Sequence, residues 1–215
     1  AHMKSRLTRA LLGLTVGAPR WDGLPKILLC WVATPVAAAV VALVLHACGG
    51  AILNRLRMSM LTRDNVLWGL LLVFGAYGSY ALGANNVANI TGVYSHTGLV
   101  DSPTALAAIG GAFMALGVVT FSRRNMMTVG SRLMRLDAYA ALVVVAAEAV
   151  TVHAFAWIGV PVSTSQAVIG GIIGVGLMRG AGAIHVSVLK TIGWAWFLSP
   201  VLAAMIASAI YRLVA

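Results

Sequence analysis

Long apolar stretches alternate with short polar segments along this chain of 215 residues. Each stretch comes close to or exceeds the ~20 mainly apolar residues that a helix needs to cross a bilayer. The pattern therefore predicts an all-α polytopic membrane protein. We expect its spans at about residues 26–48, 65–83, 103–121, 137–159 and 190–214.

The composition excludes an ordinary soluble domain, because 60% of the residues are hydrophobic and only 9% are charged. Soluble domains carry about 25% charged residues. The net charge of +10 would suit a nucleic-acid partner, but the basic residues lie between apolar stretches, where they set topology and contact anionic lipid. We therefore expect an integral protein of the cell (inner) membrane that contacts the lipid bilayer and binds no nucleic acid. Cys30 and Cys48 are interpreted as packing residues.

Two distant stretches share the pattern W-x-x-[ST]-P, each near the start of a long apolar helix. They are CWVATPVAAAVVALV at 30–44 and AWFLSPVLAAMIASA at 195–209. Internal repeats in transporters are often inverted in the membrane, so we interpret the two as matching helices that run antiparallel. The expected divisions are a basic N-terminal segment (1–21, with 1–3 read as a cloning remnant), the last helix of a first repeat (22–54) and a second repeat (55–215).

The segment GANNVAN (83–89) places polar side chains in apolar surroundings. Its glycine, Gly83, lets the backbone leave helical geometry, and Asn85 or Asn86 can cap a new helix, which predicts a helix broken at 83–86. The free N–H groups of such a helix start favour an anion, whereas side-chain carbonyls, including that of Asn89, can coordinate a cation. Hydrogen bonding between membrane helices is the alternative role of these asparagines.

The segment PVSTSQA (161–167) is the second polar interruption. A proline followed by Ser163, Thr164 and Ser165 predicts that one helix ends and another begins between 160 and 166. The glycine-rich stretch after it suits a re-entrant hairpin, since non-helical backbone at depth must be buried in protein or line a cavity. The hydroxyls can donate to an oxyanion or accept around Na⁺; the alternative is an external capped loop. We expect the two breaks to face each other near mid-membrane.

Glu148 is the only carboxylate well inside an apolar stretch. Acids within membrane helices are rare and mark functional sites by default, so Glu148 is a candidate for ion coupling; a protonated or arginine-paired packing residue is the alternative. Thr151 shares its helix face, and His153 is interpreted as a hydrogen-bonded packing residue. The sequence contains no nucleophile–base pair, phosphate-cradling loop or metal-ligand cluster, so we expect no catalytic residues and no enzyme.

Together the two polar segments resemble the inorganic phosphate transporter (PiT) family, whose members carry GANDxAN and PVSTTH motifs in each of two inverted repeats. The likeness extends over roughly residues 22–215 and includes FSRRNMMTVG at 121–130, Glu148 and the W-x-x-[ST]-P helices. It implies a secondary transporter that moves phosphate with Na⁺ or H⁺ and holds its substrate between the repeats. No cofactor is expected beyond Na⁺ as the coupling ion.

The resemblance implies roles for individual residues by position. The substrate-binding residues it implies are Asn85, Asn86, Ser163, Thr164 and Ser165. With the intramembrane carboxylate added, the ion-coupling candidates are Asn86, Asn89, Thr164 and Glu148. The one metal ion expected is Na⁺ at Asn86, Asn89 and Thr164.

The chain departs from the family pattern in three ways. Asn86 stands at the aspartate of the first motif, and Gln166 stands at the histidine of the second. Loss of a carboxylate weakens a Na⁺ site and eases binding of a dianion, so sulfate, which relatives in the superfamily transport, is an alternative substrate. Only one motif pair is present, which implies a second transporter half or a homo-oligomer as partner. A non-transporting membrane scaffold is the remaining alternative.

Overall fold

The computed structural model describes residues 24–92, 94, 102–128, 134, 136–180 and 184–214, and the regular structure in these ranges is α-helical. Five of the helices are long and apolar enough to cross a membrane, in agreement with the five predicted spans. The sixth, α6, has 16 residues. The helices are α2 (Leu24–Arg55), α3 (Met60–Gly92), α4 (Pro103–Thr128), α5 (Ala138–Trp157), α6 (Thr164–Arg179) and α7 (Val186–Val214).

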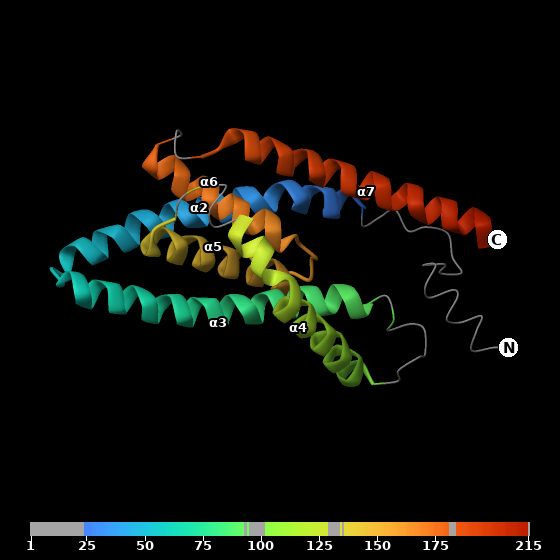
Figure 1. The fold of residues 1–215 in the computed structure, drawn as a ribbon, viewed down its shortest axis with the longest axis horizontal. Helices are drawn as coiled ribbons and strands as arrows, with labels where there is room; N and C mark the ends of the chain where they lie inside the picture. The colour runs from blue at the N-terminus through green and yellow to red at the C-terminus, as the bar shows by residue number, and fades with distance from the viewer. Residues whose placement is uncertain are drawn as a thin grey trace.

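The helices run back and forth, so that α5 and α6 form an antiparallel hairpin between α2 and α3 (Figure 1). Helices α2 and α7, which carry the W-x-x-[ST]-P pattern, run in opposite directions, as an inverted repeat requires. Their hydroxyls act alike: Thr34 donates to the carbonyl of Cys30, and Ser199 donates to that of Ala195, each at 2.6 Å. The assignment of residues 22–54 and 55–215 to two repeats stays a prediction.

Helix α6 packs against α2 through glycines that leave room for the opposing backbone. A Cβ atom at Gly170 would collide with the carbonyl of Pro35, and one at Gly174 would collide with the carbonyl of Ala39. Membrane helices associate closely where small residues line their contact. The hairpin is thereby held against α2 along much of its length.

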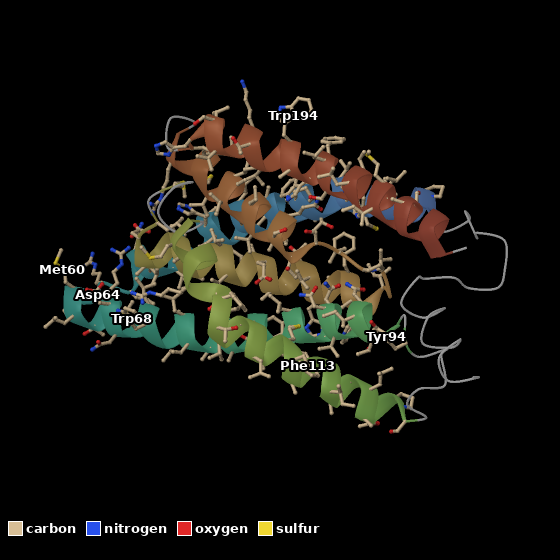
Figure 2. The ribbon with its side chains drawn as sticks, turned by 45° about the vertical axis from the view of Figure 1, so that its right-hand side comes forward. Met60, Asp64, Trp68, Tyr94, Phe113 and Trp194 are labelled. Carbon is tan, nitrogen blue, oxygen red and sulfur yellow. The ribbon has the colours of Figure 1, made fainter. Side chains whose placement is uncertain are left out.

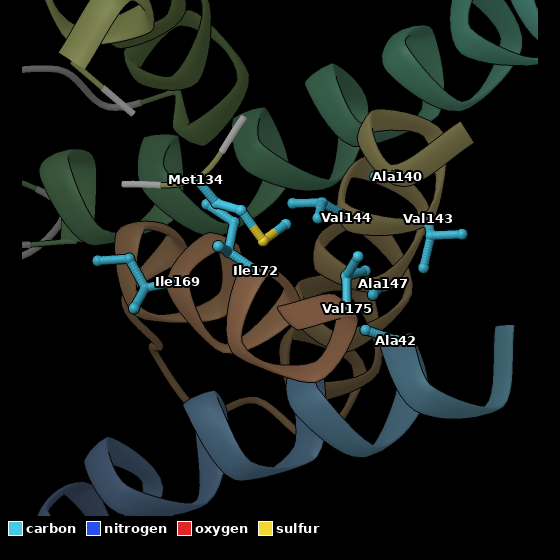
Figure 3. Packing of buried hydrophobic residues seen from close by; sticks show 9 residues of the cluster. All are labelled: Ala42, Met134, Ala140, Val143, Val144, Ala147, Ile169, Ile172 and Val175. Carbon is cyan, nitrogen blue, oxygen red and sulfur yellow. The ribbon is translucent and has the colours of Figure 1, made fainter. Parts of the chain in front are cut away.

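The main buried cluster joins α2, α5 and α6 (Figure 3). In contrast, no residue is buried in the apolar windows of α4 and α7, and large side chains such as Phe113 and Trp194 point outward (Figure 2). Helices α2, α3, α5 and α6 therefore form the packed body. The residues of the cluster are Ala42, Met134, Ala140, Val143, Val144, Ala147, Ile169, Ile172 and Val175.

The prediction of a helix break at 83–86 is wrong, because α3 continues through the whole GANNVAN segment to Gly92. Gly83 lies in open space, with nothing near the position of a Cβ atom, and the segment contains no proline. An asparagine inside a helix costs only ~0.7 kcal/mol or less relative to alanine, which packing easily offsets.

The predicted break between 160 and 166 is confirmed. Helix α5 ends at Trp157 with Ile158 as its C-cap, and the next residue, Gly159, has a φ of +74° that glycine adopts without strain. The N–H groups of Gly159 and Val160 donate back to Ala156 and Phe155 at 3.0 and 3.1 Å, which is the Schellman ending of a helix. The N-terminal segment 1–21 lies outside the described residues.

Candidate functional site

Asn85 joins the two polar segments directly. Its side-chain Nδ2 donates to the carbonyl of Val162 at 2.9 Å, and the N–H of Val162 donates to its Oδ1 at 3.3 Å. The second hydrogen on Nδ2 is directed to Oδ1 of Asn86 at 3.4 Å. Non-helical backbone at membrane depth needs such partners. Asn85, which is only 4% exposed, therefore satisfies the backbone of the break from a continuous neighbouring helix.

The other two asparagines of the segment make no hydrogen bond to the hairpin backbone in the described chain. Asn86 is half-buried and receives the Asn85 hydrogen bond, whereas Asn89 is exposed on α3. The structure thus separates three residues that the sequence grouped together. Asn85 positions the break, Asn86 lies beside it, and Asn89 faces outward.

The three hydroxyl residues meet at the start of α6. Ser163 is the N-cap, and its Oγ accepts a hydrogen bond from the N–H of Gln166 at 3.4 Å. The same Oγ lies 2.9 Å from Oγ of Ser165, and Thr164 begins the helix. The first turn of a helix presents N–H groups without intrahelical partners and the positive end of the dipole. This arrangement is suited to an oxyanion.

Three buried oxygens on α5 and α6 lack a hydrogen-bond partner among the described residues. They are Oε1 of Glu148, Oγ1 of Thr151 and Oε1 of Gln166. These residues are 7%, 3% and 8% exposed, and an unsatisfied buried group costs about 1–3 kcal/mol. Buried polar groups in native proteins are nearly always paired. The three oxygens are therefore available to a ligand.

The packing of α5 against α6 brings the three residues to a similar position along the axis of the hairpin. Gly171 of α6 lies against Val144 of α5. Because α5 and α6 are antiparallel, counting five residues from that contact places Gln166 level with Ala149, between Glu148 and Thr151. A carboxylate, a hydroxyl and an amide carbonyl are oxygen ligands of the kind that hard cations take.

Helix α3 approaches the carboxylate closely at a glycine. A Cβ atom at Gly78 would lie 3.4 Å from Oε2 of Glu148. The ion pair found among the described side chains joins Arg179 to Asp137 and leaves Glu148 without a basic partner. The arginine-paired interpretation of Glu148 is therefore wrong for the described part of the chain.

His153 has the packing role expected for it. Its Nδ1 lies 2.7 Å from the hydroxyl of Tyr77 on α3, and the rings of Tyr80 and Trp157 lie beside it with centroids 5.6 Å away. Sequence reasoning did not find the Tyr77 partner, nor the unpartnered oxygen of Gln166, which it treated only as a departure from the family motif.

An ion pair joins the start of α5 to the end of α6, at the end of the hairpin away from the break. Nη2 of Arg179 lies 2.7 Å from both carboxylate oxygens of Asp137, and Asp137 also accepts from the N–H of Ala140 at 2.8 Å, capping α5. Partial burial alone would raise the pKa of Asp137, but the Ala140 hydrogen bond and the Arg179 guanidinium outweigh it and hold that pKa below its ordinary value. No group of histidine, cysteine, aspartate and glutamate that could hold a metal is found among the described side chains.

These features define a class: an all-α integral membrane protein in which a broken helical hairpin is held by an asparagine from a continuous helix. Residues 7–207 match the phosphate transporter family, and the chain belongs to that family. The family is one of transporters rather than enzymes, as the sequence predicts.

Individual relatives agree with this assignment. A Methanocaldococcus jannaschii protein named "Putative phosphate permease" is 28% identical over 205 residues, which are 95% of this chain and 65% of the relative. "Sodium-dependent phosphate transporter 1-B" of Danio rerio is 30% identical over 154 residues, 67% of this chain and 23% of the relative. A solved structure titled "The sodium-dependent phosphate transporter" shares the fold, with a TM-score of 0.76 and 22% identity over 95% of this chain and 70% of that one. The chain thus spans about two thirds of the first relative's length and a smaller part of the second's.

Proposed function

We propose that this chain is part of a secondary transporter that moves phosphate across the membrane together with a cation. Membership in the phosphate transporter family supports phosphate as the substrate, and the name of the Danio rerio relative supports Na⁺ as the cation. The observation that carries the proposal is the set of three unpartnered buried oxygens on the hairpin whose break carries the hydroxyl groups.

The anion site in this proposal is the start of α6. The hydroxyls of Ser163, Thr164 and Ser165 and the free N–H groups of the first turn donate to the phosphate oxygens. Asn86 supplies a further amide from α3. Asn85 acts indirectly, since its amide is engaged by Val162 and Asn86 and fixes the position of the break.

The cation site lies deeper in the hairpin. Glu148 supplies charge, and Thr151 and Gln166 supply neutral oxygens. The family resemblance adds Asn86, Asn89 and Thr164 as cation ligands on the side of this site that faces the anion. A cation at Glu148 offsets the repulsion between that carboxylate and an incoming dianion, which is strong at low dielectric. Binding of the two ions is thereby coupled, and we place both within the membrane.

A second polypeptide surface is needed to complete this site. Asn89 and Ser165 are exposed on helices whose surroundings are apolar, and polar groups inside a membrane face protein or a water-filled cavity rather than lipid. The remainder of a longer chain, a separate half or a second copy of this chain would cover them.

The test is uptake of radiolabelled phosphate by proteoliposomes containing the assembled transporter. Ser163→Ala combined with Thr164→Ala is expected to reduce phosphate affinity by about 100-fold or more, because each of the two lost hydrogen bonds to a charged group contributes ~1.5–3 kcal/mol. Ser199→Ala combined with Ser208→Ala, which removes two exposed hydroxyls from α7, is the matched control and retains affinity.

Three outcomes would contradict parts of the proposal. Unchanged affinity in the hairpin variant removes the hydroxyls from the anion site. Uptake that excess sulfate suppresses more strongly than excess phosphate identifies a sulfate permease instead. Absence of any uptake by the assembled wild-type protein supports a scaffold role.

A further inference from the structure

The turn between α2 and α3 gathers positive charge beside exposed apolar side chains. Arg55 ends α2, Arg57 lies in the turn and Arg63 lies in the first turn of α3, and all three are exposed. The ion pair between Arg179 and Asp137 leaves these three arginines without an ion-pair partner in the described chain. Figure 2 shows this end of α3, with Met60, Asp64 and Trp68 labelled.

We propose that this turn binds the headgroup of an anionic phospholipid, and that it lies at the cytoplasmic face of the membrane. Anionic lipids concentrate in the cytoplasmic leaflet and attract basic residues near the surface. The proposal is independent of the proposed transport function, because it concerns a surface at the opposite end of α3 from the site.

The backbone of the turn supports an anionic partner. Ser59 caps α3, since its Oγ accepts from the N–H of Thr62 at 3.2 Å, and the first turn of α3 presents further N–H groups without intrahelical partners. A positive side chain such as Arg63 is unfavourable at this end of a helix dipole. A phosphodiester bound there would interact favourably with both the helix end and the guanidinium.

The conformation of Arg57 gives a second argument. Its φ of +41° lies in the left-handed region, and it is the one non-glycine residue with positive φ in the described chain. Glycine fits such a position without strain, whereas another residue costs ~1–2 kcal/mol. The strained position holds a long cationic side chain at the tip of the turn, where a headgroup contact would offset the cost.

The neighbouring apolar side chains favour a lipid over free phosphate. Leu56, Met60 and Leu61 are 56%, 86% and 79% exposed, beside the three arginines in sequence. Acyl chains would cover these side chains, which a free ion cannot do. Asp64, the one carboxylate of the turn region, lines a cavity of about 290 Å³ together with Arg63 and with Asp137 of α5. Arg55 and Arg57 are not part of this lining and carry the excess positive charge of the turn.

Native mass spectrometry of the purified chain with phosphatidylglycerol and with phosphatidylcholine measures this binding. Arg57→Gln combined with Arg63→Gln is expected to weaken phosphatidylglycerol binding about 25-fold, because each basic residue near an anionic lipid surface strengthens binding about fivefold. Arg123→Gln combined with Lys190→Gln removes the same charge from exposed positions on α4 and α7 and is expected to change it little.

A separate variant distinguishes lost binding from lost folding. Arg57→Gly relieves the positive φ, so its melting temperature should equal or exceed that of the wild type while phosphatidylglycerol binding falls about fivefold. Equal binding of the two lipids, equal loss in the control pair, or displacement of the lipid by millimolar inorganic phosphate would overturn the proposal.

Cysteine labelling measures on which side of the membrane the turn between α2 and α3 lies. Arg57→Cys in a chain with Cys30→Ala and Cys48→Ser is expected to react with a membrane-impermeant maleimide in inverted vesicles and not in intact cells. Labelling in intact cells would overturn the cytoplasmic placement of the turn.

Discussion

The GANNVAN segment of α3 and the break between α5 and α6 meet through Asn85 and Val162, yet one is helical and the other is not. The break contains Pro161, which lacks an N–H and disfavours helical backbone at the residue before it, and it follows a glycine in the left-handed region. The α3 segment has neither feature. Polarity alone therefore does not break a membrane helix, whereas the loss of backbone hydrogen bonds does.

The comparison also separates two uses of polar side chains. In α3, Asn85 directs its amide at the backbone of another segment. In the hairpin, the hydroxyl of Ser163 caps its own helix and lies within hydrogen-bond distance of Ser165. The continuous helix thus supplies support, and the broken one retains groups that can bind a ligand.

The largest effect is expected for Asn85→Ala. This change leaves the N–H and the carbonyl of Val162 without partners in a buried position, at about 1–3 kcal/mol each, so we expect the protein to lose about 2–6 kcal/mol of stability. Thermal unfolding followed by size-exclusion chromatography measures this loss. Asn89→Ala on the exposed face is the control, and equal melting temperatures for the two variants would show that the cross-link between the segments contributes nothing.

Proline substitutions test the same comparison between the two segments by changing the backbone instead of a side chain. Ala84→Pro removes a helical hydrogen bond from α3 and should cost ~3 kcal/mol, while Pro161→Ala acts on backbone that is already non-helical and should cost less than ~1 kcal/mol. The same thermal assay compares the two variants. If Ala84→Pro were tolerated as well as Pro161→Ala, α3 would have to be discontinuous in solution.

Thr151→Val tests the unpartnered oxygens of the hairpin. In sodium-free buffer the variant should be more stable than the wild type by about 1 kcal/mol, because an unsatisfied buried hydroxyl is replaced by an apolar group of similar shape. Added Na⁺ should then stabilise the wild type and not the variant. The control is Thr120→Val, whose exposed hydroxyl bonds within α4; sodium that stabilises Thr151→Val as much as the wild type would remove Thr151 from the cation site.

The smallest effect is expected for the ion pair between Asp137 and Arg179. Since the pKa of Asp137 lies below its ordinary value, the ionised carboxylate stabilises the fold above about pH 4, and this contribution is lost as the pH falls through the lowered pKa. Asp137 is 60% exposed, so the ion pair contributes less than about 1 kcal/mol. Asp137→Asn, which retains a capping side chain, should be slightly less stable at pH 7 and equal to the wild type at pH 2; a constant difference across this range would contradict the assignment.

Much of this architecture could be predicted from the sequence. Apolar length placed the five long helices, and the proline with three hydroxyls placed the second break. The helix of GANNVAN could not be predicted by the same reasoning, because its buried asparagine, Asn85, is paired with Val162, which lies 77 residues further along the chain. A signal for the end of α5 was present in Gly159, two residues before Pro161, and was not used.

The candidate site was predicted less completely than the fold. The sequence singled out Glu148 and the hydroxyls, but it grouped Asn85 with the ligands although its amide is used to hold the hairpin. Gln166 was found only through burial, since no local pattern shows that a side-chain oxygen lacks a partner. Such roles depend on contacts between helices, which sequence periodicity does not report.

Phosphate binding by Ser163→Asp tests the central claim most directly. Aspartate retains an N-cap oxygen, so the melting temperature should stay within a few degrees of the wild type. Its charge would lie among the donors that hold the anion, and like charges ~4 Å apart interact by about 4 kcal/mol at an effective dielectric constant of 20. In the assembled transporter with Na⁺ present, equilibrium binding of radiolabelled phosphate should therefore weaken by about 100-fold or more. A stable Ser163→Asp protein that binds phosphate with wild-type affinity would show that the start of α6 is not the anion site.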